Sequence, residues 1–283
     1  QEMTMRKKVY IVILVALALQ SAAIAQQVPI TSQYLTNGLV INPAYAGTRE
    51  ALSINLSYRK QWANITGAPQ FQTLSLHSPI NEKEKVSLGL MADYLTYGVT
   101  KDVGIYAYYA YSVRLGRGKL SMGLKGGLDL SNTNYNRLQF PDGNPADPLL
   151  TGDMKYTLPN MGVGFYYYTD RYFAGLSVPS LLTYKRDATD EFSVIPDYKM
   201  FMSCLTAGTL LQFADIIKVK PSVLVRYSIH KPLEVDLNAN LIIADLLWVG
   251  GSYRMAEKAV VALVDLQITP QLKLGYSYDY QLG

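Results

Sequence analysis

Between Asp102 and Ser131, apolar and polar residues alternate along two runs that are joined by a short turn at 116–118. Successive side chains of a strand point to opposite faces, so this alternation predicts two antiparallel strands with one apolar face each. The apolar face carries Val103, Ile105, Ala107, Tyr109, Tyr111, Val113 and Leu115 on the first strand, and Leu120, Met122, Leu124, Leu128 and Leu130 on the second. The opposite face is polar or small.

The length of these strands narrows the fold class. Each is about as long as a tilted strand needs to be to cross a bilayer, and strands of soluble sandwiches are usually nearer half that length. An apolar face toward lipid and a polar face toward a lumen are typical of outer-membrane β-barrels. We therefore predict an all-β, transmembrane, antiparallel outer-membrane β-barrel of about 14 strands.

The same alternation predicts thirteen strands in all. They lie at 51–60, 70–77, 86–97, 102–115, 119–132, 160–169, 171–178, 199–213, 217–227, 233–243, 245–254, 257–267 and 271–281. Bacterial barrels close with an even number of strands. Either the count is wrong by one, or a closing fourteenth strand is missing from the end of this chain.

The connections differ in length. Two long polar links, 133–159 and 179–198, contrast with tight turns such as 169–171 and 256–258. Long loops on one rim and short turns on the other are the usual barrel asymmetry, with the long loops facing outward. The turn-rich residues 26–50 precede the first strand, and we interpret them as an irregular segment that could enter the lumen.

The first residues carry a secretory signal. Arg6, Lys7 and Lys8 precede the apolar stretch 9–19, and Ala23-Ile24-Ala25 forms a small-x-small cleavage site. We predict a signal peptide at 1–25 and a single barrel domain at 26–283, in the outer membrane of a Gram-negative bacterium.

Composition agrees with a barrel and excludes other classes. Charged residues make up only 17%, and 23 Tyr stand against 7 Phe and 2 Trp. Tyrosine places its ring among lipid headgroups and its hydroxyl in water, so barrels use it in interfacial girdles. Without residues 1–25 the net charge is about +2, and no basic stripe is present, so we predict outer-membrane lipid as a partner and no nucleic acid.

Candidate catalytic chemistry is sparse, so we predict that the protein is not an enzyme and uses no cofactor or metal. His77 and His230 are the only histidines, and neither has a Cys, Asp or Glu at metal-ligand spacing. Ser75 and His77 share a strand face, as in barrel lipases, but no third orienting residue is evident. The single cysteine, Cys204, forms no internal disulfide.

Two short motifs are candidate sites for binding a partner or plugging the lumen. One is the turn motif Asn42-Pro43-Ala44-Tyr45-Ala46-Gly47, in which Asn42, Pro43, Tyr45 and Gly47 are the candidate residues. It is either a shaped turn or a contact surface. The other holds Arg59, Gln61 and Trp62 near the end of the first strand. Arg59 either clamps the 26–50 segment or a client's tail, or pairs with a luminal Asp while Trp62 joins the girdle.

These motifs also carry a family resemblance. The chain resembles the PorP/SprF family of the Bacteroidota type IX secretion and gliding machinery. The matching residues are Gln33-Tyr34, Asn37, Asn42 to Gly47, Tyr58 to Trp62, Gly67-Ala68-Pro69, Gly98-Val99, Tyr106-Ala107-Tyr108, Leu120, Gly123-Leu124, Leu158-Pro159-Asn160, Gly162, Gly164, Gly175 to Pro179, Lys220-Pro221-Ser222, Gly250 to Arg254 and Gly275 to Asp279. Family members run on through one more strand, which the resemblance implies is absent here.

The resemblance implies a role in protein export and surface display. Proteins of this kind bind, help secrete or anchor large surface adhesins through the adhesins' C-terminal signal domain. Some also dock a periplasmic machinery component that is linked to peptidoglycan. The alternative that the residues leave open is a passive outer-membrane channel for small solutes or lipids, because the predicted inner face is polar.

Overall fold

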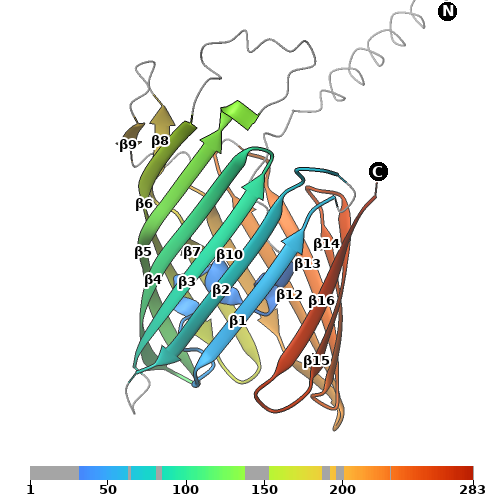
Figure 1. The fold of residues 1–283 in the computed structure, drawn as a ribbon. Helices are drawn as coiled ribbons and strands as arrows, with labels where there is room; N and C mark the ends of the chain where they lie inside the picture. Colours follow the sequence, from blue (N-terminus) through green and yellow to red (C-terminus); the bar gives the residue numbers. More distant parts are fainter. Residues whose placement is uncertain are drawn as a thin grey trace, which may run out of the picture. The chain divides into compact units, whose positions relative to one another are not determined.

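The structure, a computed structural model, describes residues 32–62, 65–80, 85–137, 153–186, 192–195, 201–229 and 231–282. The predicted signal peptide at 1–25 and His230 lie outside these residues. The unit that spans Thr31–Gly283 is almost entirely antiparallel sheet (Figure 1). No helix among the described residues is long and apolar enough to cross a membrane.

Sixteen strands and four 3-10 helices make up the described chain. The helices are η1 (Ser32–Leu35), η2 (Gly38–Val40), η3 (Pro43–Tyr45) and η4 (Tyr135–Arg137). The strands are β1 (Ser53–Lys60), β2 (Gln70–Pro79), β3 (Val86–Tyr97), β4 (Thr100–Leu115), β5 (Gly118–Asn134), β6 (Asp153–Tyr168), β7 (Tyr172–Val178), β8 (Thr183–Arg186), β9 (Phe192–Ile195), β10 (Ser203–Thr209), β11 (Leu211–Ala214), β12 (Ile217–Tyr227), β13 (Glu234–Ile243), β14 (Leu247–Arg254), β15 (Ala259–Gln267) and β16 (Lys273–Gln281).

One 14-stranded sheet contains all of these strands except the separate β8–β9 hairpin. Its path runs β1-β2-β3-β4-β5-β6-β7-β10-β12-β13-β14-β15-β16, and β11 continues the chain of β10 while pairing with β12. Every pairing along the path is antiparallel, so β1 and β16, the first and thirteenth strands, run in the same direction. Figure 1 shows these two strands side by side at the front of the curled sheet, although no ladder joins them in the described part of the chain.

The thirteen strands predicted from alternation correspond to the thirteen strands along this path. The long links were predicted too long. β5 and β6 extend into the 133–159 link, because Asn134 pairs with Asp153 at the far end of a ladder that also pairs Leu128 with Pro159. The 179–198 link contains the β8–β9 hairpin, which the prediction missed. Its two strands have only four residues each, too few for alternation to be read with force.

The alternation of burial along the strands defines two faces. On β4, Ile105, Ala107 and Tyr109 are exposed, and the intervening Tyr106 and Tyr108 are buried. Large apolar side chains are exposed in the same way around the sheet, and they include Leu56, Leu90, Leu124, Leu176, Val249 and Val264. An apolar surface this extended is unlike that of a water-soluble monomer and matches the lipid-facing band of a membrane barrel.

The two ends of the sheet differ in their connections. We call the end that carries the turns at 116–117, 169–171, 215–216 and 244–246 the turn end, and the opposite end the loop end. The chain enters β1 at Ser53 from the turn end, because Ser53 pairs with His77 near the last residue of β2. The long links between β5 and β6 and between β7 and β10 are at the loop end. The turn at 255–258 between β14 and β15 lies at the loop end too, so the prediction that places the tight turn 256–258 on the opposite rim is wrong, because the direction of β14 and not the length of the turn decides its rim.

The lipid-facing band generates a first prediction. Leu90→Arg, in the middle of β3 and beside Leu76 and Ala107, should reduce the free energy of folding into phospholipid bilayers by about 2–4 kcal/mol. Leu115→Arg, at the last residue of β4 beside the turn, should cost only about 0–1 kcal/mol, because charges near the interface stay hydrated. Urea titration of the vesicle-inserted protein measures both values, and equal costs would contradict a membrane-spanning sheet.

Candidate functional site

The residues from the start of η1 up to the loop before β1 form a segment with its own local structure, which we call the plug (residues 32–50). Asn42 caps η3, because its Oδ1 accepts from the Ala44 N–H at 2.9 Å and Pro43 occupies the first position of the turn. Gly47 closes the motif with φ +76°, a backbone conformation that favours glycine. The Asn42 to Gly47 sequence therefore specifies the shape of the plug.

Hydrogen bonds tie the plug to six strands, β1, β2, β5, β6, β7 and β13. Asn37 donates to Ser75 Oγ at 2.8 Å, and the Gly47 N–H donates to His77 Nδ1 at 3.0 Å. Asn42 Nδ2 donates to the Phe165 carbonyl at 3.0 Å. Ser177 Oγ donates to the Ile41 carbonyl at 2.6 Å, and Tyr34 Oη donates to Asn238 Oδ1 at 3.1 Å. Asn37 also donates to Asn55 Oδ1 of β1 at 3.4 Å, and Lys119 of β5 donates to Glu50.

Close packing adds to these bonds. Leu39 is 1% exposed and belongs to a cluster with Met91, Tyr106, Tyr108 and Ala110 of β3 and β4. At Gly123 of β5, an added Cβ would lie 2.2 Å from the Ala44 nitrogen, so the strand backbone and the plug backbone are in direct contact. The plug, blue in Figure 1, lies against the curved inner face of the sheet.

The structure separates the two sets of predicted site residues. Asn42, Pro43, Tyr45 and Gly47 are all in the plug, where Asn42 and Pro43 are buried and the Tyr45 ring makes edge contacts with His77 and Tyr166. Gln61 and Trp62 follow β1 at the loop end, and Trp62 is 46% exposed with φ +48°. Arg59 donates to Asp279 of β16. Their roles in binding a partner stay predictions.

Sequence reasoning missed the residues that hold the plug on the wall side. The sequence presents Ser75 and His77 as a lipase-like pair and His77 as a possible metal ligand, yet both residues are buried and both accept hydrogen bonds from the plug. The usable signal was their position on the inward face of a strand beside a turn-rich segment. Asn37 carries no motif of its own, so nothing in the sequence marked it as a donor to Ser75. Among the described residues, no group of three His, Cys, Asp or Glu is placed to hold a metal ion.

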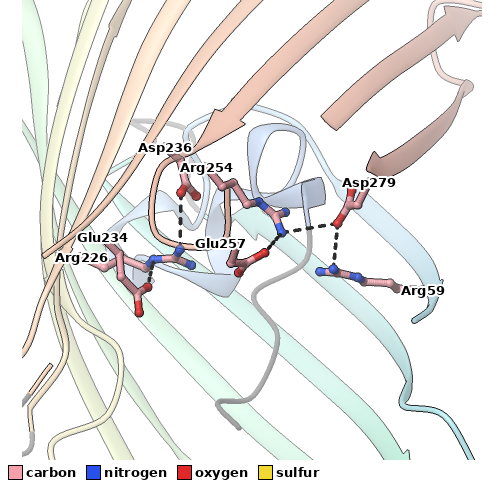
Figure 2. Close-up of polar contacts among 7 residues, drawn as sticks. All are labelled: Arg59, Arg226, Glu234, Asp236, Arg254, Glu257 and Asp279. Carbon is pink, nitrogen blue, oxygen red and sulfur yellow. Dashed lines mark hydrogen bonds and ion pairs between the residues drawn. The ribbon is translucent and has the colours of Figure 1, made fainter. Parts of the chain in front are cut away.

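A second polar feature lies toward the loop end. We call it the charge belt, and Figure 2 shows its members: Arg59, Arg226, Glu234, Asp236, Arg254, Glu257 and Asp279. Asp279 Oδ2 accepts from Arg59 Nη2 at 2.7 Å and faces Arg254 Nη1 at 3.4 Å. Arg254 also pairs with Glu257 at 3.0 Å, and Arg226 pairs with Glu234 at 2.8 Å and Asp236 at 3.4 Å. The belt therefore links strands that are far apart in sequence.

The charge belt extends across the space between β1 and β16, which we call the seam. The Arg59–Asp279 pair joins the two strands toward the loop end. Toward the turn end a recess of about 480 Å³ is lined by residues 51–56 on one side and by 270–273, 275–277 and three residues of β15 on the other, and Thr36 and Arg49 of the plug line it as well. A carboxylate bridge at one end and a recess at the other make the seam a distinct feature of the wall.

Tyr34 of the plug lies close enough to the charge belt for the Asp236 carboxylate to affect its hydroxyl. Burial, together with the nearby carboxylate of Asp236, raises the pKa of the Tyr34 hydroxyl well above its usual range. The hydroxyl therefore stays protonated and acts as a hydrogen-bond donor to Asn238 at any physiological pH.

Comparison with known proteins identifies the protein family. The family model for the type IX secretion system membrane protein PorP/SprF matches residues 23–283. The chain belongs to the PorP/SprF family. No curated protein matches the sequence significantly.

Family membership and the fold support each other. A PorP/SprF protein is a membrane component of type IX secretion, and the all-antiparallel sheet with its apolar outer face is the outer-membrane barrel predicted from the sequence. The match includes the plug and the charge belt, so both features lie within the family region of the chain.

The contact between plug and wall generates a second prediction. Gly123→Ala should destabilise the protein by about 1–3 kcal/mol, because its Cβ would collide with the backbone of Ala44. Gly126→Ala is the matched control, since an added Cβ there has no atom within 4 Å and lies on the exposed face of the same strand. Thermal unfolding in detergent measures the difference. Equal melting temperatures for the two variants would contradict the seating of η3 on β5.

The seam generates a third prediction. Asp279→Asn should cost about 1–3 kcal/mol, because Asp279 joins Arg59 and Arg254 in a partly buried site. Glu257→Gln removes only one half-exposed partner of Arg254 and should cost less than about 1 kcal/mol. Thermal unfolding at low and high salt compares them, and a larger loss for Glu257→Gln would place the critical bridge elsewhere.

Proposed function

We propose that this protein is a plugged outer-membrane barrel that binds large surface adhesins through their C-terminal signal domain and helps secrete or anchor them. The partners in this proposal are the adhesin domain, outer-membrane lipid and a periplasmic machinery component linked to peptidoglycan. The proposed host is a Gram-negative bacterium of the Bacteroidota type. Family membership in type IX secretion supports the export role.

The observation that carries the proposal is the attachment of the plug. Six hydrogen bonds to five strands, the buried Leu39 and the backbone contact at Gly123 hold residues 34–47 against the inner wall. A segment so firmly seated favours a docking platform over a passive pore, because a channel for solutes needs a clear path along its axis.

The plug also makes a fourth prediction, which separates docking from passive transport. The wild-type protein in planar bilayers should show no steady conductance, and deletion of residues 32–50 should open one. His77→Ala, which removes the acceptor of the Gly47 N–H, should give brief openings, because one tie of the plug is lost while the others remain. Steady conductance of the wild type would support the alternative, a passive channel for small solutes or lipids.

Partner capture tests the export role directly. The tagged protein, purified from gently solubilised native membranes, should bring with it a large secreted protein whose C-terminal signal domain is required for the association. An excess of that isolated domain should displace the secreted protein, and an excess of an unrelated domain of similar size should not. Repeated recovery of the barrel alone would contradict the proposal.

A further inference from the structure

A small cavity lies between the plug and the wall on the side of β6, β7, β10 and β12. Its volume is about 90 Å³. Tyr34, Leu35, Gly38, Ile41, Asn42 and Tyr45 line it from the plug, and Tyr166, Phe173, Thr206, Lys220, Ser222 and Val223 line it from the wall. Neither the charge belt nor the hydrogen bonds of the plug account for this space.

One wall of the cavity presents polar groups without partners. The Lys220 ammonium has no hydrogen-bond or ion-pair partner among the described residues, and its Nζ lies 5.3 Å from the centroid of the Phe173 ring. The Ser222 hydroxyl is buried and is likewise without a partner in the described part of the chain. Lys220 and Ser222 are two residues apart on β12, so their side chains share the inward face. A half-buried cation and a buried hydroxyl that both lack a partner in the described part of the chain are polar groups that a ligand can satisfy.

Aromatic rings line the cavity beside these polar groups. Tyr45 and Tyr166 meet edge to face at 5.7 Å, and Tyr166 stacks on Phe173 at 5.8 Å. Phe173 and Ser222 flank Gly208 on neighbouring strands, so the cavity offers a cation and a hydroxyl with ring faces next to them. This combination suits a ligand with an anionic head and a short apolar body.

The electrostatic surroundings favour an anion. The Arg49 Nε donates to the Tyr45 hydroxyl at 3.4 Å. Burial raises the pKa of that hydroxyl, but the nearby Arg49 and Lys220 outweigh burial, so the Tyr45 pKa lies below its usual value. Positive charge thus prevails at this edge of the cavity.

A second recess adjoins the cavity toward the turn end. Lys220 and Phe173 also line this recess, which has a volume of about 250 Å³ and reaches the turn residues Thr169, Asp170 and Arg171. Lys218 lines it too, but that ammonium is already paired with both carboxylate oxygens of Asp245 at 2.7 and 2.8 Å. Lys220 therefore differs from Lys218 on the same strand, because no carboxylate among the described residues pairs with it.

From this arrangement we propose that Lys220 and Ser222 bind the carboxylate of a small organic acid, with its apolar part against Phe173 and Tyr166. The small volume of about 90 Å³ favours a carboxylate that carries only one or two further carbons. The site does not depend on the proposed export role.

The test uses propionate as the probe and the full-length protein in detergent micelles. Line broadening of the propionate resonances should show saturable binding to the wild type, with 1-propanol, which lacks the charge, binding at least ten times more weakly. Lys220→Met should weaken propionate binding at least ten-fold. Lys218→Met is the matched control on the same strand face, and binding should stay within two-fold of wild type because Lys218 is already neutralised by Asp245.

A second variant keeps the test decisive if Lys220→Met folds poorly. Ser222→Ala leaves the charge in place and removes only the buried hydroxyl, and it should weaken binding several-fold. Inorganic phosphate, titrated in parallel, should compete poorly if the aromatic wall contributes. Unchanged propionate binding in Lys220→Met or in Ser222→Ala, or equal binding of propionate and 1-propanol, would overturn the proposal.

Discussion

The bilayer sets the constraint on which the rest of this structure depends: no backbone amide or carbonyl can go unpaired in hydrocarbon. The sheet meets this demand by antiparallel pairing along a path of thirteen strands, in which each strand from β2 to β15 has a ladder on both sides. The seam is the exception: β1 and β16 run in the same direction, and in the described part of the chain a side-chain bridge, not a ladder, joins them.

On the inward face of the sheet, polar side chains must find hydrogen-bond or ion-pair partners away from bulk water. They do so in two ways at two positions along the strands. Near the turn end the plug supplies amides and carbonyls to Ser75, His77 and Ser177. Toward the loop end the charge belt satisfies arginines with carboxylates from neighbouring strands and from the seam. The cavity beside Lys220 differs from both, since its polar groups face open space.

The sequence predicts the strands well and the interior poorly, and the reason is physical. Alternation is a local property, so the thirteen strands could be located from residues such as Val103 to Leu115 with no knowledge of their neighbours. The pairing of Arg59 with Asp279 joins positions 220 residues apart, and nothing local to either residue encodes it. The Asn42 to Gly47 motif lies between these cases. Its shape follows from the cap and the turn residues, but its seat on Gly123 depends on the register of a distant strand.

The plug has no linker between it and the wall. Glu50 is followed after two residues by Ser53, the first residue of β1, and β1, like β16, is an edge strand with a ladder on one side only in the described sheet. Any pull on the plug is therefore delivered directly to an edge strand of the sheet. Withdrawing the plug and loosening the seam are therefore mechanically coupled. A force applied to residues 32–50 acts on β1 and on the contact between β1 and β16 as well as on the lumen.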